Sequence, residues 1–239
     1  MSRFTIPLAA LLGAVLGAGA MLWGSGHFAP AGDQARIEQV VHDYLLAHPE
    51  VLPDAMDALR DKQHAKTIAD NHAAILEPFG SAWAGSAHPD LTIVEYYDYN
   101  CGYCRASLPA IAQLLASDPK LRIVFREFPV LADSSASAAR MSLAAAEQGK
   151  FKPFHDSLYA GGPVTDQSIA AAAKIAGVDT VKAAAFAPKA DAEIAANMGI
   201  ARQLGLTGTP SWVIGNHVVS SALPLEDLQN LVAKARAKG

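Results

Sequence analysis

The chain has 239 residues, of which 51% are hydrophobic and 18% charged, and its formal net charge is −4 at pH 7. This length allows one large domain with an appended segment, and the hydrophobic content is sufficient for a core. The slightly negative charge and the lack of a basic block in the sequence argue against nucleic acid as a partner.

Residues 1–32 are typical of an export segment followed by a spacer. Arg3 is the only early charge, and no charged residue occurs from Phe4 to Trp23. The sequence Ala-Gly-Ala at positions 18–20 fits a small-x-small cleavage site, and the apolar run is also long enough to span a bilayer. The sequence leaves open a cleaved signal peptide or an inner-membrane anchor. Either places the remaining chain in the periplasm or another extracytoplasmic, oxidising compartment.

Residues 33–77 are predicted to form a helical N-terminal arm. Asp33 suits an N-cap, and apolar residues recur at helical spacing over residues 35–47. Pro49 interrupts this pattern and is expected to begin a second helix that reaches about Leu76. The middle of the second helix is polar. Two roles are therefore open for the arm: packing on its own domain, or self-association into a homo-oligomer.

The main domain is predicted to occupy residues 78–239. A stretch rich in Pro, Gly, Ser and Ala precedes residue 91 and is expected to include a short edge strand. Residues 91–97 are strand-like, residues 106–115 are helix-like, and a second strand begins at Leu121. Strand, helix and strand in this order predict a βαβ unit.

The two cysteines of the chain, Cys101 and Cys104, lie where the first strand of this unit turns into the helix. A Cys-x-x-Cys pair at this place indicates a dithiol redox site. The unpaired N–H groups at the helix N-terminus stabilise a thiolate at the first position. The second thiol, one turn later, is placed to attack a mixed disulfide formed at the first.

A Cys-x-x-Cys pair can also serve as a zinc site, an inert disulfide or a copper site. A structural zinc ion needs about four ligands, and the chain offers two cysteines and scattered histidines. An inert disulfide would close so small a loop that it would add little stability. Two thiolates can hold Cu(I), so a copper-binding stress protein is the alternative function. We expect no metal and no cofactor other than the redox-active disulfide Cys101–Cys104.

The remainder of the chain is predicted to be largely helical and to end in a hairpin and a helix. Five helical segments are expected, at residues 134–149, 151–159, 166–176, 180–187 and 191–204. Two short β-rich runs flank Gly215-Asn216, which fits a two-residue hairpin turn. A closing helix is expected from Pro224 to Lys238. His155 and His217 are expected to be structural residues rather than catalysts.

Together these features resemble the thioredoxin fold, an α/β class, with a helical insertion at about 130–205 that is similar to that of the DsbA family. That family comprises exported thiol–disulfide oxidoreductases. The resemblance covers about residues 90–238 and rests on three strings: Thr-Ile-Val-Glu-Tyr-Tyr-Asp-Tyr-Asn-Cys-Gly-Tyr-Cys, Phe-Arg-Glu-Phe-Pro and Thr-Gly-Thr-Pro-Ser. The arm resembles that of ScsC-like and Com1-like members. In that subgroup such arms mediate self-association, and some members act as disulfide isomerases.

The resemblance implies roles by position. Cys101 corresponds to the exposed nucleophile and Cys104 to the buried resolving thiol. Pro210 corresponds to a cis-proline that packs against the disulfide. The backbone of Thr209 would then be free to pair with an extended substrate segment.

Glu95 occupies the position of the family's buried acid. A buried carboxyl has a raised pKa and can relay a proton to or from Cys104. Gly102 and Tyr103 stand where strongly oxidising members carry Pro-His, and Tyr103 cannot stabilise a thiolate by charge. We therefore expect a less oxidising disulfide, with Gly102 and Tyr103 available for substrate contact.

The sequence therefore predicts a thiol–disulfide oxidoreductase that oxidises or isomerises cysteines of other exported proteins. The direction depends on a redox partner, for which a DsbB-like oxidase and a DsbD-like reductase are the implied candidates.

Overall fold

The structure, a computed structural model, describes residues 31–238. Its chain divides into two compact units with the boundary between Asp57 and Ala58, and each unit is described by itself. The predicted export segment lies outside the described residues apart from its last two positions. Among the helices that are described, none is both long and apolar enough to cross a membrane.

The N-terminal unit contains α2 (Ala31–Ala47) and the first turns of α3 (Val51–Asp70). Helix α2 confirms the helix predicted over residues 35–47. Its apolar stripe follows the spacing i, i+3, i+4, i+7, which puts the members on one helical face. Four side chains, each more than half exposed, form this stripe: Ile37, Val40, Val41 and Tyr44.

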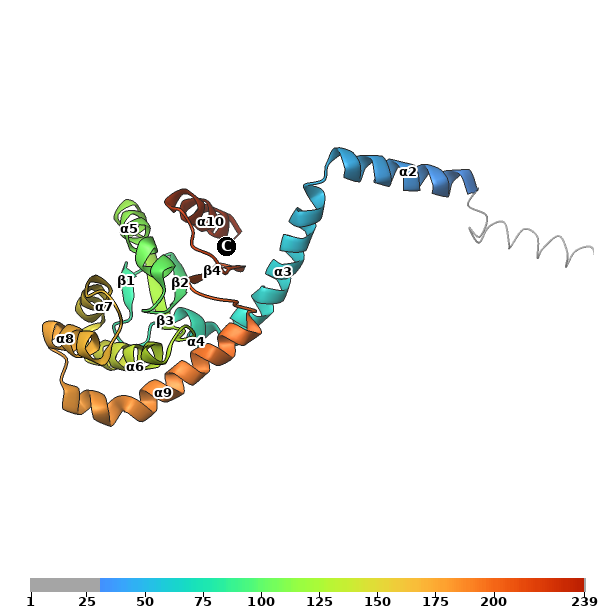
Figure 1. The fold of residues 1–239 in the computed structure, drawn as a ribbon. Helices are drawn as coiled ribbons and strands as arrows, with labels where there is room; N and C mark the ends of the chain where they lie inside the picture. Colours follow the sequence, from blue (N-terminus) through green and yellow to red (C-terminus); the bar gives the residue numbers. More distant parts are fainter. Residues whose placement is uncertain (1–30, 239) are drawn as a thin grey trace, which may run out of the picture. The chain divides into compact units, whose positions relative to one another are not determined.

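The second unit is built on a mixed sheet with the strand order β1-β3-β2-β4-β5 (Figure 1). The strands are β1 (Trp83–Gly85), β2 (Leu91–Tyr97), β3 (Leu121–Glu127), β4 (Ser211–Ile214) and β5 (His217–Val219). Strands β2 and β3 are parallel and are joined by α5 (Gly102–Ser117), which confirms the predicted βαβ unit. The predicted edge strand and terminal hairpin are also present, since β1 pairs with β3 and β5 with β4.

Alternating side chains of the central strands divide the core between the two faces of the sheet. Ile93 and Tyr97 of β2 pack with residues of α5 and α10 (Leu225–Lys238), including Ile111. Val94 and Tyr96 point the other way, toward α4 (His72–Leu76) and the end of α9 (Thr180–Gln203). Side chains along a strand alternate between the two faces of the sheet, so Glu95 lies on the same face as Ile93 and Tyr97. This is the face that α5, the helix that follows the cysteine motif, covers.

Between β3 and β4 the chain forms α6 (Asp133–Glu147), α7 (Phe151–Ala160), α8 (Asp166–Ala176) and α9. The predicted break between residues 187 and 191 is wrong, because α9 runs through Pro188 without interruption. Proline removes one backbone N–H and frees the carbonyl one turn earlier. Pro188 is exposed, so water can reach the freed carbonyl group.

The predicted single helix from Pro49 to Leu76 is also wrong. The observed helix α3 begins two residues later, at Val51. The helical path is broken at Asn71, which has φ −115° and ψ 24°, before α4 begins. The Asn71 amide donates to the Thr67 carbonyl at 2.8 Å, a local bond that competes with regular helix geometry. Ile68 and Ile75, one on each side of the break, are both buried in the core. The compact unit therefore begins before residue 78, where the sequence placed the domain boundary.

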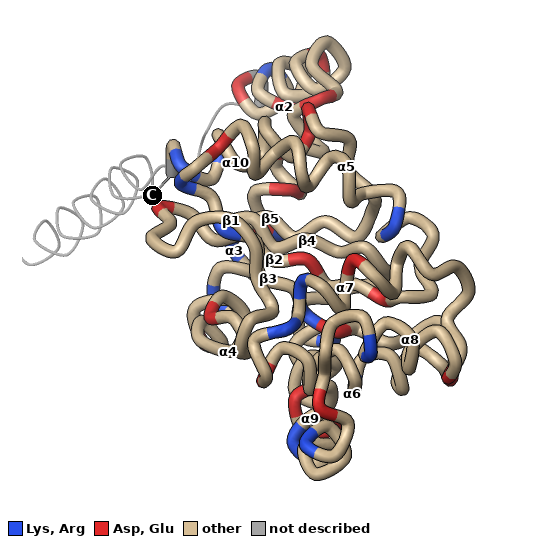
Figure 2. Tube along the Cα trace, turned by 90° about the vertical axis from the view of Figure 1, so that its left-hand side faces the viewer, with Lys and Arg blue, Asp and Glu red and all other residues tan. Residues whose placement is uncertain are grey.

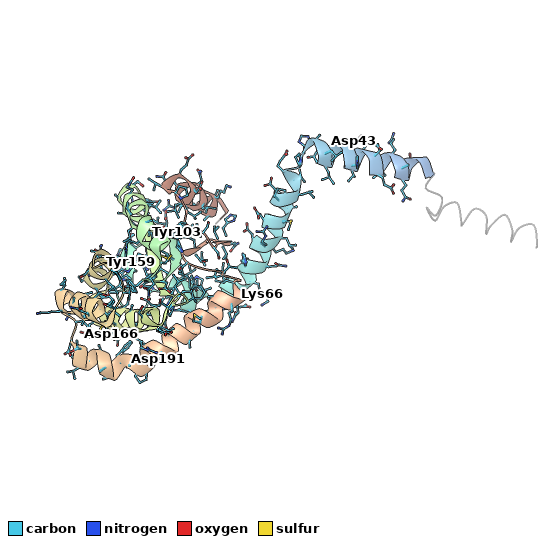
Figure 3. The ribbon with its side chains drawn as sticks, viewed as in Figure 1. Asp43, Lys66, Tyr103, Tyr159, Asp166 and Asp191 are labelled. Carbon is cyan, nitrogen blue, oxygen red and sulfur yellow. The ribbon has the colours of Figure 1, made fainter. Side chains whose placement is uncertain are left out.

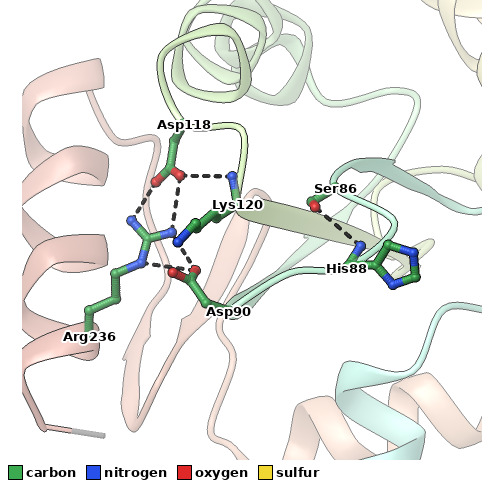
Figure 4. A network of polar contacts seen from close by, with 6 residues as sticks. All are labelled: Ser86, His88, Asp90, Asp118, Lys120 and Arg236. Atoms are coloured by element: carbon green, nitrogen blue, oxygen red, sulfur yellow. Dashed lines mark hydrogen bonds and ion pairs between the residues drawn. The ribbon is translucent and has the colours of Figure 1, made fainter.

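Surface ion pairs fasten the closing helix to loops of the sheet. Arg236 of α10 pairs with Asp90 and with Asp118, each at 2.6 Å (Figure 4). The hydrogen bond from Arg236 is the main cause that lowers the pKa of Asp118. Acidic and basic residues are otherwise interspersed over the described elements, and α9 carries both signs (Figure 2).

Arg126 of β3 connects three elements from a buried position, with 3% of its surface exposed. Its guanidinium pairs with Glu193 of α9 at 2.7 Å and donates to the carbonyls of Ile75 and Glu77 at the end of α4. A buried cation is tolerated only where such partners replace water.

We expect Arg126→Met to lower the free energy of unfolding by about 3 kcal/mol, because the partly buried carboxylate of Glu193 and two carbonyls lose their donor. Urea denaturation of the full chain measures this change. Arg236→Met is the matched control at a partly exposed ion pair, and its cost should stay near or below about 1 kcal/mol. Equal costs for the two variants would contradict this account of Arg126.

Candidate active site

Cys101 is the N-cap of α5, and Cys104 lies one turn into the helix. The backbone N–H of Cys104 donates to the Cys101 sulfur at 3.3 Å. This bond satisfies one of the orphan N–H groups of the helix start, and the dipole there favours negative charge. The structure thus confirms that the first thiol of the motif lies at the helix N-terminus.

Both cysteines are free thiols, and both are buried: 4% of Cys101 and 1% of Cys104 is exposed. The expectation that Cys101 is exposed is therefore wrong. Its thiol turns inward and donates to the backbone carbonyl of Thr209 at 3.1 Å. A substrate must displace or share this contact in order to reach the sulfur.

The Thr209–Pro210 peptide bond is cis, as the resemblance to the DsbA family implied. Pro210 is buried directly before β4, which pairs with the strand that leads to the cysteines. The chain thereby brings the Thr209 carbonyl to Cys101 across more than a hundred residues of sequence. In this reduced form that carbonyl is engaged by the thiol rather than free for a substrate. The Thr209 hydroxyl is buried without a partner among the described residues.

Glu95 is buried in β2, with 1% of its surface exposed, which agrees with the predicted buried acid. Desolvation and, secondarily, the negative charge of Cys101 raise its pKa to about 8. One of its carboxyl oxygens has no hydrogen-bond partner among the described residues. Desolvation and the negative charge of Glu95 together raise the pKa of the Cys104 thiol. Cys104 therefore remains a thiol until a base accepts its proton.

The arrangement suits acid–base assistance of thiol–disulfide exchange. A carboxyl with a pKa near the working pH can both donate and accept a proton. The charge of Glu95 interacts with the sulfurs of both Cys101 and Cys104. The backbone N–H of Cys104 interacts with the Cys101 sulfur. No group of three or more Cys, His, Asp or Glu side chains that could hold a metal ion occurs in the described part of the chain.

Gly102 and Tyr103 open α5 and are exposed. Tyr103 is labelled in Figure 3. Tyr103 has 70% of its surface exposed, so its ring is available to a partner. A Cβ atom on Gly102 would meet no atom within 4 Å, so no steric clash requires glycine at this position.

Asp98 positions the loop before the cysteines, a role that the sequence analysis missed. Its buried carboxylate accepts hydrogen bonds from the backbone N–H groups of Asn100, Val130 and Leu131 at 2.8–3.0 Å. Its carbonyl accepts the N–H of Cys101 at 3.0 Å. The signal was a lone acid directly after a buried strand and three residues before the first cysteine.

A second polar network is buried behind this loop. The hydroxyl of Tyr99 lies 2.9 Å from Ser142 Oγ and 3.1 Å from His155 Nδ1. The hydroxyl of Tyr97 contacts the hydroxyl of Tyr99 and donates a hydrogen bond to Glu127. Desolvation raises the pKa of Glu127 to about 8. His155 is thus a buried structural residue, as predicted. His217 pairs with Asp61 of α3 at 2.9 Å.

The raised pKa of Glu95 predicts a specific pH dependence of stability. The folded state keeps this proton up to about pH 8, while the unfolded state loses it near pH 4.5. Stability therefore falls as pH rises through this window, because the folded state binds more protons. We expect Glu95→Gln to abolish this loss and to be more stable than the wild type at pH 8.5 by on the order of 4 kcal/mol, with a difference below about 1 kcal/mol at pH 5.

Urea denaturation at pH 5, 7 and 8.5 tests this expectation. Glu127 also carries a raised pKa, so the quantity to compare is the difference between variant and wild type at each pH. Glu147→Gln, at an exposed position, is the matched control. Parallel stability curves for Glu95→Gln and the wild type would show that the carboxyl is ionised in the folded protein.

Two family models match the chain. The model described as "DSBA-like thioredoxin domain" matches residues 92–233, and "Copper resistance protein ScsC N-terminal domain" matches residues 33–66. Among curated proteins, the chain is 38% identical over 78 residues to Na(+)/H(+) antiporter NhaA 3 of Salinispora tropica. That match covers 32% of this chain, and the chain spans 12% of the length of that relative.

Solved structures match a larger share of this chain than that curated relative does. A thioredoxin-like oxidoreductase from Silicibacter pomeroyi is 35% identical with a TM-score of 0.66, over 70% of this chain and 98% of that chain. A periplasmic thioredoxin-like protein from Salmonella enterica is 30% identical with a TM-score of 0.61, over 70% and 95%. Proteus mirabilis ScsC in a transitional conformation is 27% identical with a TM-score of 0.67, over 87% and 99%.

The family match spans most of the domain that carries the cysteine pair, the buried acid and the cis-proline. The shorter match lies on the helical arm. The chain therefore belongs to the DSBA-like thioredoxin domain family of thiol–disulfide oxidoreductases, with an N-terminal region that matches ScsC.

Proposed function

We propose that this protein is an exported thiol–disulfide exchange enzyme that acts on cysteines of other exported proteins. The observation that carries the proposal is the Cys101 sulfur at the N-cap of α5, bonded to the Cys104 amide and facing the residue before the cis-proline. Such a sulfur is stabilised as a thiolate and lies beside backbone that can receive an extended peptide.

In the reducing direction, the Cys101 thiolate attacks one sulfur of a substrate disulfide. A mixed disulfide forms, and the displaced substrate thiolate takes up a proton. Cys104 then loses its proton and attacks Cys101, which closes the Cys101–Cys104 disulfide and releases the substrate with two added electrons. In isomerisation, a substrate thiol displaces Cys101 instead, so no net electrons are transferred.

Glu95 acts as the acid–base group for Cys104. Its neutral form near pH 7 can protonate the Cys104 thiolate when that sulfur leaves, and its ionised form can accept the proton when Cys104 attacks. The pKa of about 8 supports both directions with one residue.

Substrate contacts are assigned to the surface around the sulfur. The exposed apolar side chains of Tyr103, Val130 and Leu131 flank the site, the latter two on the loop held by Asp98. Backbone pairing would be supplied at Thr209 once the thiol releases its carbonyl. Gly102 beside Tyr103 leaves room for an approaching chain.

An extracytoplasmic location and a redox partner complete the proposal. The predicted export segment and the periplasmic relative from Salmonella enterica support a periplasmic site of action. A DsbB-like oxidase would keep the site oxidised for disulfide formation, and a DsbD-like reductase would keep it reduced for isomerisation. The expected partners include no nucleic acid.

We assign the arm to self-association with further copies of this chain, which favours isomerisation. The α2 stripe places four apolar side chains on one helical face, a pattern suited to a partner helix. Association through the arms would bring several Cys101 sites to one misfolded substrate and raise their effective concentration.

We expect the double variant Val40→Lys, Tyr44→Lys to weaken self-association roughly 100-fold, because two apolar contacts become charged. Sedimentation velocity measures this change. Reactivation of a scrambled-disulfide protein should fall with it, while reduction of a small disulfide stays unchanged. Gln39→Lys, His42→Lys on the opposite face adds the same charges and should leave all three measurements unchanged.

If both double variants behave like the wild type, the arm does not mediate assembly. Rapid oxidation of dithiol peptides without reactivation would instead assign the protein as an oxidase. The copper alternative predicts stoichiometric Cu(I) binding by the reduced protein, loss of that binding in Cys101→Ser, and weak exchange activity.

A further inference from the structure

One cation beside the cysteine pair has no role in the exchange mechanism. Arg105 follows Cys104 directly in α5 and is exposed. Its backbone N–H donates to the Cys101 carbonyl at 3.2 Å, and residues four apart lie close to the same side of a helix. Helical side chains lean toward the N-terminus of their helix. The Arg105 side chain therefore extends toward the turn that carries Cys101.

Two contacts place the Arg105 guanidinium group at the rim of the active site. It donates to the Gly162 carbonyl at 2.9 Å and lies 6.0 Å from the centroid of the Tyr159 ring. The Tyr159 hydroxyl donates to the Asp98 carbonyl, which also accepts the N–H of Cys101. One aromatic side chain thus links the guanidinium group to the loop that carries the attacking sulfur.

Arg105 has no acidic partner in the described part of the chain, whereas Arg126, Arg140 and Arg236 each form an ion pair with a carboxylate. A guanidinium group has five N–H donors, and the Gly162 carbonyl accepts from one of its nitrogens. The other donors of this exposed side chain are available to a carboxylate of another molecule, which arginine can bind through two parallel hydrogen bonds.

Helix stability does not explain a cation at this position. The N-terminus of a helix carries partial positive charge, so an acid in the first turn is stabilising and a cation there is not. Arg105 lies in the first turn of α5, and that turn contains no acidic residue. The helix dipole and the guanidinium group therefore present positive charge together to a substrate that approaches Cys101.

We propose that Arg105 selects substrate cysteines that have a carboxylate side chain two residues before or after them, through an ion pair between that carboxylate and the guanidinium group. Side chains two residues apart in an extended peptide share a face and are separated by about 7 Å, a span that an arginine side chain can cover. This inference rests on the exchange activity proposed above and names the charge pattern of its preferred substrates.

The test uses reduced full-length protein and peptides whose single cysteine is joined by a disulfide to pyridine-2-thiol. Attack of the Cys101 thiolate on the peptide sulfur forms the mixed disulfide and expels the pyridine thiolate, which takes up a proton and absorbs light as the uncharged thione. The peptides carry Glu, Gln or Lys two residues before or after the cysteine and are otherwise identical. The rate of thione release is compared between them.

We expect a Glu peptide to react about 2- to 5-fold faster than its Gln counterpart, the range of an exposed ion pair, and the Lys peptide to be the slowest. The advantage should disappear at about 1 M salt, because charges in water are then screened over a few ångströms. The ratio of the Glu rate to the Gln rate within one variant cancels any change in Cys101 reactivity, so a merely structural role of Arg105 would not move it.

Substitutions of Arg105 identify the residue that causes the preference. Arg105→Gln should make the Glu and Gln rates equal, Arg105→Glu should make the Lys peptide the fastest, and Arg105→Lys should keep the wild-type order. Lys189→Gln removes an exposed cation from α9, which packs against α6, and should keep the wild-type ratio.

Equal rates for all peptides, or a Glu preference that persists in Arg105→Gln, would overturn this proposal and leave the exchange activity in place. Failure of every peptide to react would overturn the exchange activity as well.

Discussion

The reactive end of the molecule depends on how Asp98 holds the chain between β2 and α5. Its buried carboxylate accepts three backbone N–H groups, and its carbonyl accepts the N–H of Cys101 and the hydroxyl of Tyr159. Hydrogen bonds to a charged acceptor are stronger than neutral ones, which offsets the cost of burying this side chain. These contacts fix where α5 begins and therefore place the Cys101 sulfur at a helix N-terminus.

The two carboxyl groups with raised pKa values show how function is balanced against stability. Glu95 and Glu127 are both buried and both have a pKa of about 8. Each lowers stability as pH rises, because the folded state holds a proton that the unfolded state has lost. Glu127 accepts a hydrogen bond from Tyr97, whereas one carboxyl oxygen of Glu95 has no partner among the described residues. A proton-transferring carboxyl group needs an oxygen that is free of other hydrogen bonds, and burying such a group lowers the stability of the fold.

Local sequence patterns predicted the elements that carry the chemistry. The βαβ unit, the helix start at the cysteines, the cis-proline and the hairpin at Gly215 depend on short-range signals or on family strings, and all are present. The errors arise where distant parts of the chain decide. A helix was predicted to end at residue 187, but α9 continues through Pro188, which is exposed.

Tertiary contacts also explain the remaining differences. Cys101 was expected to be exposed, yet its thiol turns toward the Thr209 carbonyl, a contact that no local pattern reveals. The role of Asp98 depends on the N–H groups of Val130 and Leu131, which follow the next strand in sequence. The hydrogen bond between His155 and Tyr99 likewise joins α7 of the helical block to the loop between β2 and α5.

The central claim is that Cys101, although buried at rest, is the sulfur that attacks the substrate. Reaction of the reduced Cys104→Ser variant with a disulfide-containing peptide, followed by mass spectrometric mapping, tests this most directly. The account predicts that a mixed disulfide accumulates on Cys101, because no resolving thiol remains, and that reduced Cys101→Ser forms no comparable adduct. An adduct on Cys104 of the Cys101→Ser variant, formed at a similar rate, would contradict the assignment.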